Sequence, residues 1–132
     1  MRVVLDTNVI IAAFAARGLC TEVFEVCLEG HNIVISEYIL SETKRKLVEK
    51  IHLPRGVVQD IIEYLRDVAE VVEREPVDKP TCRDESDDGI IGTALGGNAT
   101  FIITGDKDLL VLRRYKGIKI VTPRDFWNRL RR

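Results

Sequence analysis

Short β-rich apolar segments alternate with amphipathic, helix-like segments along the chain, and this alternation restricts the fold more than any other feature. Each apolar run of strand length is followed by a stretch in which apolar residues recur every three or four positions. Strands joined by helices favour a parallel sheet covered by helices on both faces. The fold class is therefore α/β, with a central parallel sheet of four to five strands. Strands are expected at 2–5, 32–35, 100–104 and 118–121, with a short one beginning at 71–72.

The helical segments have recognisable starts and ends. Ser36 is placed to cap a helix over 37–51, and Pro54 fits the first turn of the next helix, whose apolar stripe extends from 57 to 69. A helix over 88–95 could be capped by Ser86 or Asp87 and ended by Gly96-Gly97. Other helices are expected at 6–16, at 21–28 with an end at Gly30, and after Thr122-Pro123, with a loop at 75–85.

The length of 132 residues and a hydrophobic content of 45% suit a single folded domain over residues 1–132. No stretch of the sequence approaches the roughly 18 uninterrupted apolar residues of a membrane span. Met1-Arg2 leads directly into the first strand, so we expect a cytoplasmic protein without a signal sequence. The three cysteines, Cys20, Cys27 and Cys82, give neither a disulfide framework nor a CxxC metal pair, and packed thiols are the simpler interpretation.

Charge is unevenly distributed, although the net charge is only −1. Residues 1–106 carry 11 Lys/Arg and 19 Asp/Glu, whereas residues 107–132 carry 9 and 2. A basic segment beside an acidic remainder could guide a polyanion toward an acidic, metal-filled pocket. An explanation at least as good for this feature alone is that Arg129, Arg131 and Arg132 solvate a C-terminal helix and complement its dipole.

Acidic residues follow two of the expected strands. Asp6 ends the first strand, and Asp106 follows the strand at 100–104. Open α/β sheets place their chemistry at such strand ends. If the two strands are neighbours, the carboxylates leave the sheet about 5 Å apart and need a shared proton or a cation. Mg²⁺ or Mn²⁺ would meet that need and leave positions for phosphate oxygens, which indicates a metal-dependent reaction on a polyanionic substrate. Asp88 and Glu42, on two helices, are further candidates.

Each acid also has an ordinary structural explanation. Asp6 could cap the first helix, and Asp88 could stabilise a helix N-terminus within an acidic loop. Asp106 could be a turn residue, with Asp108 in a similar position. On a helical wheel, Glu42 lies about 140° from the apolar stripe of its helix, so periodicity makes it solvent-facing unless that helix borders the site.

Four segments are similar to motifs of the PIN-domain family, and they occur in the family order over nearly the whole chain. They are MRVVLDTNVIIAAF at 1–14, Ser-Glu-Tyr-Ile-Leu-Ser-Glu at 36–42, Asp-Asp-Gly-Ile-Ile-Gly-Thr-Ala-Leu at 87–95 and Ile-Ile-Thr-Gly-Asp-Lys-Asp-Leu-Leu at 102–110. More narrowly, the chain resembles the VapC-like group, the toxin components of toxin–antitoxin systems. The resemblance implies a compact three-layer α/β/α sandwich and a Mg²⁺- or Mn²⁺-dependent ribonuclease centre.

By motif position, the resemblance places the four family acids at Asp6, Glu42, Asp88 and Asp106. Asp6, Asp88 and Asp106 would hold the metal, and Glu42 would bind it or orient the attacking water. RNA would be the substrate, and a separately encoded antitoxin and a second copy of the chain would be the protein partners. The supporting positions are Asn8, Thr104, Asp87 and Asp108. Of these, Asp87 and Asp108 could instead be the true ligands.

Several basic residues follow the fourth acid and are candidate contacts to substrate phosphates. The basic run 44–46 could contribute if its helix borders the site, although a solvated helix face is the commoner explanation of such a run. The candidates near the fourth acid are Lys107, Arg113, Arg114 and Lys116.

Two other functions fit parts of the sequence. A regulatory or binding module of the same fold would have lost turnover, and the complete set of four acids disfavours it. A metal-dependent phosphatase would use Asp6 as a covalent nucleophile and would carry a second aspartate two residues later, where this chain has Asn8.

Glycines mark two departures from the family pattern. Relatives of the VapC-like group often carry a larger residue at the position of Gly89. Gly92 and Gly96 each weaken a helix by roughly 1 kcal/mol relative to alanine, and close backbone packing against the sheet would explain them.

Overall fold

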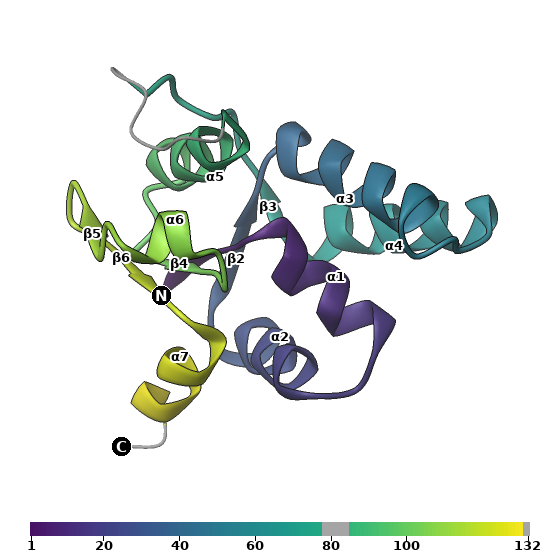
Figure 1. The fold of residues 1–132 in the computed structure, drawn as a ribbon, viewed down its shortest axis with the longest axis horizontal. Coiled ribbons are helices and arrows are strands. Elements are labelled where there is room, and N and C mark those ends of the chain that lie inside the picture. Colours follow the sequence, from purple (N-terminus) through teal and green to yellow (C-terminus); the bar gives the residue numbers. More distant parts are fainter. Residues whose placement is uncertain (78–84, 131–132) are drawn as a thin grey trace.

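The structure, a computed structural model, describes residues 1–77 and 85–130. Within these residues six strands form one sheet in the order β3-β2-β1-β4-β6-β5 (Figure 1). Neighbouring strands pair in parallel except β5, which runs antiparallel to β6 at the edge of the sheet. The strands are β1 (Arg2–Leu5), β2 (Asn32–Ile35), β3 (Glu70–Val71), β4 (Phe101–Ile103), β5 (Arg114–Tyr115) and β6 (Ile118–Val121).

The expected α/β class is confirmed, and the parallel part of the sheet has the predicted number of strands. The additional strand β5 was not predicted, because two residues are too few to show a period. Its hairpin closes through Lys116 and Gly117, whose φ angles of 46° and 83° are both positive. Positive φ at both central residues is typical of the tight turns that match the twist of a hairpin.

Helices lie on both sides of the sheet (Figure 1). On one side α2 (Leu19–Gly30) packs against α7 (Pro123–Leu130). On the other side α5 (Glu85–Gly96) contacts β1, β2 and β4. The helix α3 (Glu37–Glu49) packs against α1 (Thr7–Ala15), α4 (Arg55–Val68) and α5, and a single helical turn, α6 (Lys107–Leu110), follows β4.

The strands form the centre of the core, helices on both faces supply the larger share of it, and α7 closes one end. Phe126 of α7 is fully buried and packs edge to face on Phe101 of β4, with ring centroids 5.5 Å apart. Cys27 is also fully buried and Cys20 is partly buried, as packed thiols should be. Burial raises the pKa of the Cys27 thiol to about 12. Cys82 lies outside the described residues.

Three helix starts agree with the sequence to within one residue. Ser36 caps α3, since its hydroxyl accepts a 3.4 Å hydrogen bond from the Ile39 amide. Pro54 stands directly before α4, which begins at Arg55. The last helix begins at Pro123 as expected.

Two other helix starts differ from expectation. The second helix begins at Leu19, not at residue 21. The helix α5 begins at Glu85, so Ser86 and Asp87 lie inside it and not before it. The loop predicted at 75–85 falls partly on residues 78–84, which are outside the described residues.

Gly92 and Gly96 allow a close backbone approach, but the partner is not the sheet itself. A Cβ atom at Gly96 would collide with the carbonyl oxygen of Glu73, and one at Gly92 with that of Glu75. The Glu75 amide also donates a 2.9 Å hydrogen bond to the Gly92 carbonyl oxygen. The two glycines therefore let the segment after β3 lie directly on α5.

Among the described residues, no helix has both the length and the apolar character needed to cross a membrane.

Candidate metal centre

The ends of β1 and β4 lie side by side, which brings Asp6 and Asp106 to one edge of the sheet. Leu5 pairs with Ile103 at the end of the parallel ladder. The Asp6 amide extends the ladder by one hydrogen bond, 3.0 Å long, to the Ile103 carbonyl oxygen. The sequence-based expectation that these two strands are neighbours is confirmed.

Thr104 links the two acids through its fully buried hydroxyl. The hydroxyl donates a 2.5 Å hydrogen bond to Asp6 Oδ2 and accepts a 2.9 Å hydrogen bond from the Asp106 amide. Asp106 Oδ1 accepts a further 2.9 Å hydrogen bond from the Asp108 amide, as the N-cap of α6. The turn role considered for Asp106 is therefore real, whereas Asp6 makes no side-chain capping bond to α1.

Three carboxylates form a group compact enough to hold one metal ion. One oxygen each from Asp87, Asp106 and Asp108 lie within 4.8 Å of one another. Asp87 is only 3% exposed and comes from α5, whereas the other two come from the start of α6. Carboxylates this close repel one another unless a proton or a cation neutralises them. An all-oxygen set suits Mg²⁺ or Mn²⁺.

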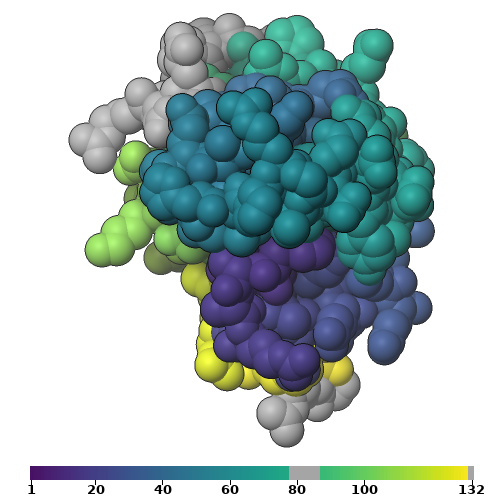
Figure 2. All heavy atoms as spheres, turned by 90° about the vertical axis from the view of Figure 1, so that its right-hand side faces the viewer, coloured from purple at the N-terminus to yellow at the C-terminus, as the bar shows by residue number. Residues whose placement is uncertain are grey.

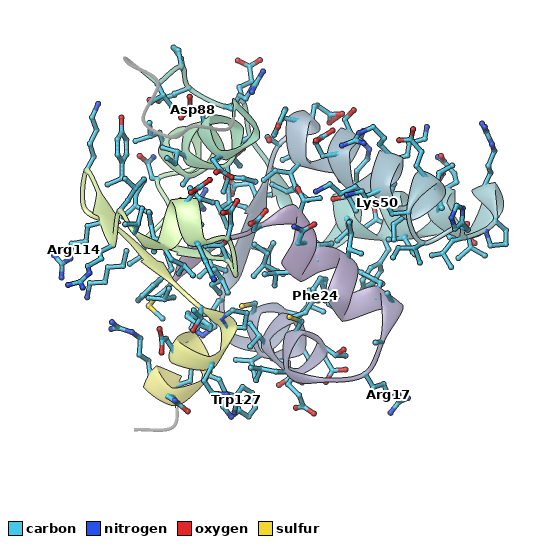
Figure 3. All side chains as sticks on the ribbon, viewed as in Figure 1. Arg17, Phe24, Lys50, Asp88, Arg114 and Trp127 are labelled. Carbon is cyan, nitrogen blue, oxygen red and sulfur yellow. The ribbon has the colours of Figure 1, made fainter. Side chains whose placement is uncertain are left out.

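A pocket of about 90 Å³ lies beside this group, and acids from four separate segments line it. These acids are Asp6, Glu42, Asp87 and Asp106. Figure 3 shows carboxylate oxygens gathered between α5 and the start of α1. We call this hollow the acidic pocket. Its other lining residues are Thr7, Asn8, Tyr38, Lys46 and Ile90.

A larger hollow of about 480 Å³ is lined by residues 13–18 and by Thr21, Glu22 and Glu25 of α2. Figure 2 shows this side of the molecule, with α3 and α4 lying over α1. Because no group of acids compact enough for a metal occurs there among the described residues, the chemistry favours the smaller acidic pocket.

Asp6 is only 8% exposed, and its surroundings change the pKa of its carboxyl group. Burial raises the pKa of the Asp6 carboxyl, and the charge of Asp106 adds to the rise. The Thr104 hydrogen bond and the charge of Lys46 act in the opposite direction without cancelling it. A cation in the pocket would oppose the effect of burial, because a nearby positive charge favours the ionised carboxylate.

Glu42 lines the acidic pocket, which answers the question that the helical wheel leaves open. Its side chain is 23% exposed, and the Arg45 guanidinium donates two 3.1 Å hydrogen bonds to its carboxylate. The helix α3 borders the site, so the side of α3 away from its apolar stripe forms one wall of the pocket. Periodicity alone cannot reveal this arrangement.

Asp88 is the candidate that the structure does not bring to the pocket. Successive helical residues point about 100° apart, so Asp87 and Asp88 have different surroundings. Asp87 lines it and belongs to the three-carboxylate group, whereas Asp88 does neither. Asp88 Oδ1 is buried and has no hydrogen-bond partner among the described residues.

The suggested phosphate contacts separate into a near and a distant group. Lys107 is exposed and follows Asp106 directly. Arg114 and Lys116 belong to the hairpin that leads into Ile118, the first residue of β6, and Figure 3 shows Arg114 at the outer edge of the molecule. Because β6 is parallel to β4, this turn lies at the end of the sheet opposite the acidic pocket. Arg113 is exposed just before β5.

Two pocket residues were missed or undervalued in the sequence. Tyr38 lines the pocket beneath the guanidinium of Arg74, which lies 4.6 Å from its ring centroid. Lys46 also lines the pocket, and its Nζ donates a 3.1 Å hydrogen bond to Asn8 Oδ1. Tyr38, Glu42 and Lys46 are spaced four residues apart on α3, so they follow one another along one side of the helix. That polar stripe is the signal that could have identified them.

Known proteins provide an independent comparison. The PIN-domain family matches residues 2–108 of this chain. The chain is 32% identical to the uncharacterized protein MJ1680 of Methanocaldococcus jannaschii over 139 residues, which cover 96% of this chain and 89% of that protein. The structure of VapBC2 from Rickettsia felis, bound to a DNA fragment from their promoter, is similar with a TM-score of 0.65 at 16% identity. That similarity covers 92% of this chain and 98% of the matched chain.

A parallel sheet with an acidic centre at the carboxyl ends of its strands defines an α/β domain that carries its chemistry at that edge. The chain belongs to the PIN-domain family, and the VapBC2 structure has a similar fold. Proteins of the family are generally nucleases, a class of hydrolases. A divalent metal is typical of such nucleases, and the chain has a matching group of carboxylates.

Proposed function

We propose that this protein is a metal-dependent endoribonuclease that hydrolyses RNA phosphodiester bonds. The observation that supports it best is the convergence of Asp6, Glu42, Asp87 and Asp106 on one small pocket. These residues come from four segments that are far apart in the sequence. A purely structural role would not require so many carboxylates to meet where their repulsion is greatest.

The carboxylates fit a hard divalent cation. Asp87, Asp106 and Asp108 have oxygens within 4.8 Å of one another, and Asp6 is a buried carboxyl group whose pKa is raised. We assign these four residues to metal binding, with Asp87 in the place expected for Asp88. A bound Mg²⁺ or Mn²⁺ ion would lower the pKa of a water molecule and neutralise charge developing on the phosphate.

The remaining residues of the pocket have supporting roles in this proposal. Glu42 is held by Arg45 on the α3 wall, where its carboxylate can orient the attacking water and accept its proton. Thr104 holds the carboxylate of Asp6 and the backbone of Asp106 in fixed relation. Asn8 has a neutral amide where a phosphatase of this type would need an acid, which favours the nuclease over that alternative.

The test is cleavage of single-stranded and structured RNA by the purified protein with Mg²⁺, with Mn²⁺ and with EDTA. We expect cleavage only with metal, and its loss in Asp106→Asn. The matched control is Asp67→Asn, an exposed aspartate on α4 that is remote in sequence from every pocket residue. Hydrolysis of a small phosphate ester without RNA cleavage would favour the phosphatase, and RNA binding without cleavage would favour an inactive module.

A toxin role in the cytoplasm is the second part of the proposal. The similar fold of VapBC2 from Rickettsia felis supports a separately encoded antitoxin as a partner. Expression of the wild type in a bacterial host should arrest growth, and expression of Asp106→Asn should not. Growth arrest by both forms would contradict a nuclease toxin. A homodimer stays a prediction, which light scattering after size-exclusion chromatography tests.

A further inference from the structure

Lys46 differs in its contacts from the other cations near the acidic pocket. Arg45 is committed to carboxylates, with hydrogen bonds of 3.1 Å to Glu42 and 3.4 Å to Glu49. Lys46 instead donates one hydrogen bond, 3.1 Å long, to the neutral amide oxygen of Asn8. Among the described residues, no carboxylate lies within ion-pair distance of its ammonium group.

This arrangement argues against a purely charge-balancing role for Lys46. Lys46 lines the pocket together with four acids, and its hydrogen-bond partner Asn8 also lines it. If its function were to neutralise these acids, a direct ion pair would be the more stable arrangement. An ammonium group has three N–H donors, and Asn8 takes one, so two donors and the full positive charge remain for a ligand.

The ammonium group of Lys46 can bind an anion. The size of the pocket restricts which part of an anion can enter. Four acids line the cavity of about 90 Å³, and Lys46 lines it on the α3 side. A phosphate group placed here can face the metal-binding acids on one side and an ammonium on the other. The hydrogen bond to Asn8 holds the ammonium group at the pocket, which reduces the conformational entropy lost on binding.

We propose that Lys46, held in place by Asn8, binds a non-bridging oxygen of the RNA phosphate that enters the acidic pocket. The inference rests on the proposed nuclease function and specifies the substrate contact on the α3 wall. It makes Lys46 a substrate-binding residue and Asn8 its positioning residue. One pocket would then hold both contacts, that of Lys46 with the phosphate and that of the acids with the metal.

The experiment separates RNA binding from metal binding. Lys46→Met removes the charge while retaining the apolar side-chain stem, and Lys46→Arg retains the charge. Lys50→Met is the matched control, because Lys50 is an exposed lysine of the same segment that does not line the pocket (Figure 3). Binding of a short fluorescein-labelled single-stranded RNA is measured at several salt concentrations, in EDTA, with all variants also carrying Asp106→Asn. Mn²⁺ binding is measured on the forms that retain Asp106, by the electron paramagnetic resonance signal of free Mn²⁺.

We expect Lys46→Met to weaken RNA binding and to reduce the slope of log affinity against log salt by about 0.7, the value for one lost phosphate contact on a single strand. Lys46→Arg should keep the wild-type slope, and Lys50→Met should change it less. Mn²⁺ affinity should stay equal or rise in Lys46→Met, because a positive charge near the acids is removed. RNA affinity should therefore fall without any fall in Mn²⁺ affinity.

Three results would overturn the inference. The first is a slope of log RNA affinity against log salt that is equal in Lys46→Met and Lys50→Met. The second is a fall in Mn²⁺ affinity as large as the fall in RNA affinity, which would mean that Lys46 only maintains the structure. The third is no measurable RNA binding by the reference protein. Failure of the nuclease proposal is recognised separately, by the absence of metal-dependent cleavage in the wild type, which the binding experiment does not require.

Discussion

Thr104 and Asp6 face each other across the ends of two parallel strands, and a 2.5 Å hydrogen bond joins the threonine hydroxyl to the aspartate carboxylate. Thr104 is fully buried and Asp6 nearly so. The same hydroxyl also accepts a hydrogen bond from the Asp106 amide. The Thr104 side chain therefore links Asp6 to Asp106.

Thr104→Val should destabilise the protein by about 1–3 kcal/mol, because it leaves a buried carboxylate without its donor. The variant should also lose RNA cleavage, since both acids lose their common partner. Urea denaturation at neutral pH measures the free energy of unfolding. Thr104→Ser, which keeps the hydroxyl, is the control and should stay closer to the wild type than valine does. Equal stability of the valine and serine variants would contradict this role.

Asp6→Asn should raise the thermal stability of the metal-free protein at neutral pH. The folded protein raises the pKa of Asp6 above its ordinary value of 3.8. The favourable contribution of this group is therefore fully present below that value and is lost as the pH rises through the folded-state pKa. The stability gained in Asp6→Asn should appear at pH values above the range in which Asp6 titrates in the folded protein. It should vanish below that range, where the Asp6 carboxyl group is itself neutral. Melting temperatures measured in EDTA across the acidic range test this, and a gain independent of pH would contradict it.

Asp87 and Asp88 should respond differently to metal. Mn²⁺ should raise the melting temperature of the wild type, because a ligand that binds the folded state stabilises it. We expect Asp87→Asn to lose most of this shift and Asp88→Asn to retain most of it, since only Asp87 joins the carboxylate group. The two substitutions are chemically identical and adjacent in the chain, so each is the control for the other. The reverse order would restore the assignment to Asp88 that the family motif implies.

Lys107 should contribute more to RNA cleavage than Arg114. Lys107 follows Asp106, whereas Arg114 lies on the edge strand that turns at the opposite end of the sheet. Screening by salt limits contacts of exposed charges to about 10 Å, so the distant arginine acts only on RNA that extends well beyond the pocket. We expect a larger fall in kcat/KM for Lys107→Gln than for Arg114→Gln on a short RNA. A larger effect of Arg114 would show that the edge hairpin is a main RNA contact.

The strand half of the site is easier to predict from sequence than the helix half. Asp6 and Asp106 follow apolar runs, and the rule that parallel strands share one carboxyl edge is enough to bring them together. No such rule exists for Glu42, because the packing of α3 against α1, α4 and α5 decides which side of the helix borders the pocket. The turn α6 and the strand β5 have four and two residues, too few for a period.

The choice between Asp87 and Asp88 depends on the rotation of α5, which the sequence specifies only indirectly. The apolar pattern of this helix is weak, and its rotation is instead fixed by glycines. Gly92 and Gly96 face the backbone after β3, while Gly89 faces the ring of Tyr38. A sequence motif cannot decide which of two adjacent aspartates is the metal ligand when only the packing of the helix distinguishes the two positions.

Gly89 and Tyr38 should be strongly coupled in stability. A Cβ atom at Gly89 would overlap the Cε2 atom of the Tyr38 ring, which lines the acidic pocket. We expect Gly89→Ala to lower the free energy of unfolding by about 1–3 kcal/mol, because overpacking outweighs the better helix propensity of alanine. With Tyr38→Ala in place the overlap is gone, and Gly89→Ala should then be stabilising by up to about 1 kcal/mol.

The reversal of sign is the informative result, and a double-mutant cycle by urea denaturation measures it. Gly56→Ala is the control: Gly56 also lies in a helix, but a Cβ atom there would meet nothing within 4 Å. That substitution should stabilise the protein equally with and without Tyr38. If Gly89→Ala were as stabilising as Gly56→Ala in the wild-type background, the Tyr38 ring would not be packed on α5. The wall of the pocket between α3 and α5 would then be open, and the position of Glu42 one turn further along α3 would lose its support.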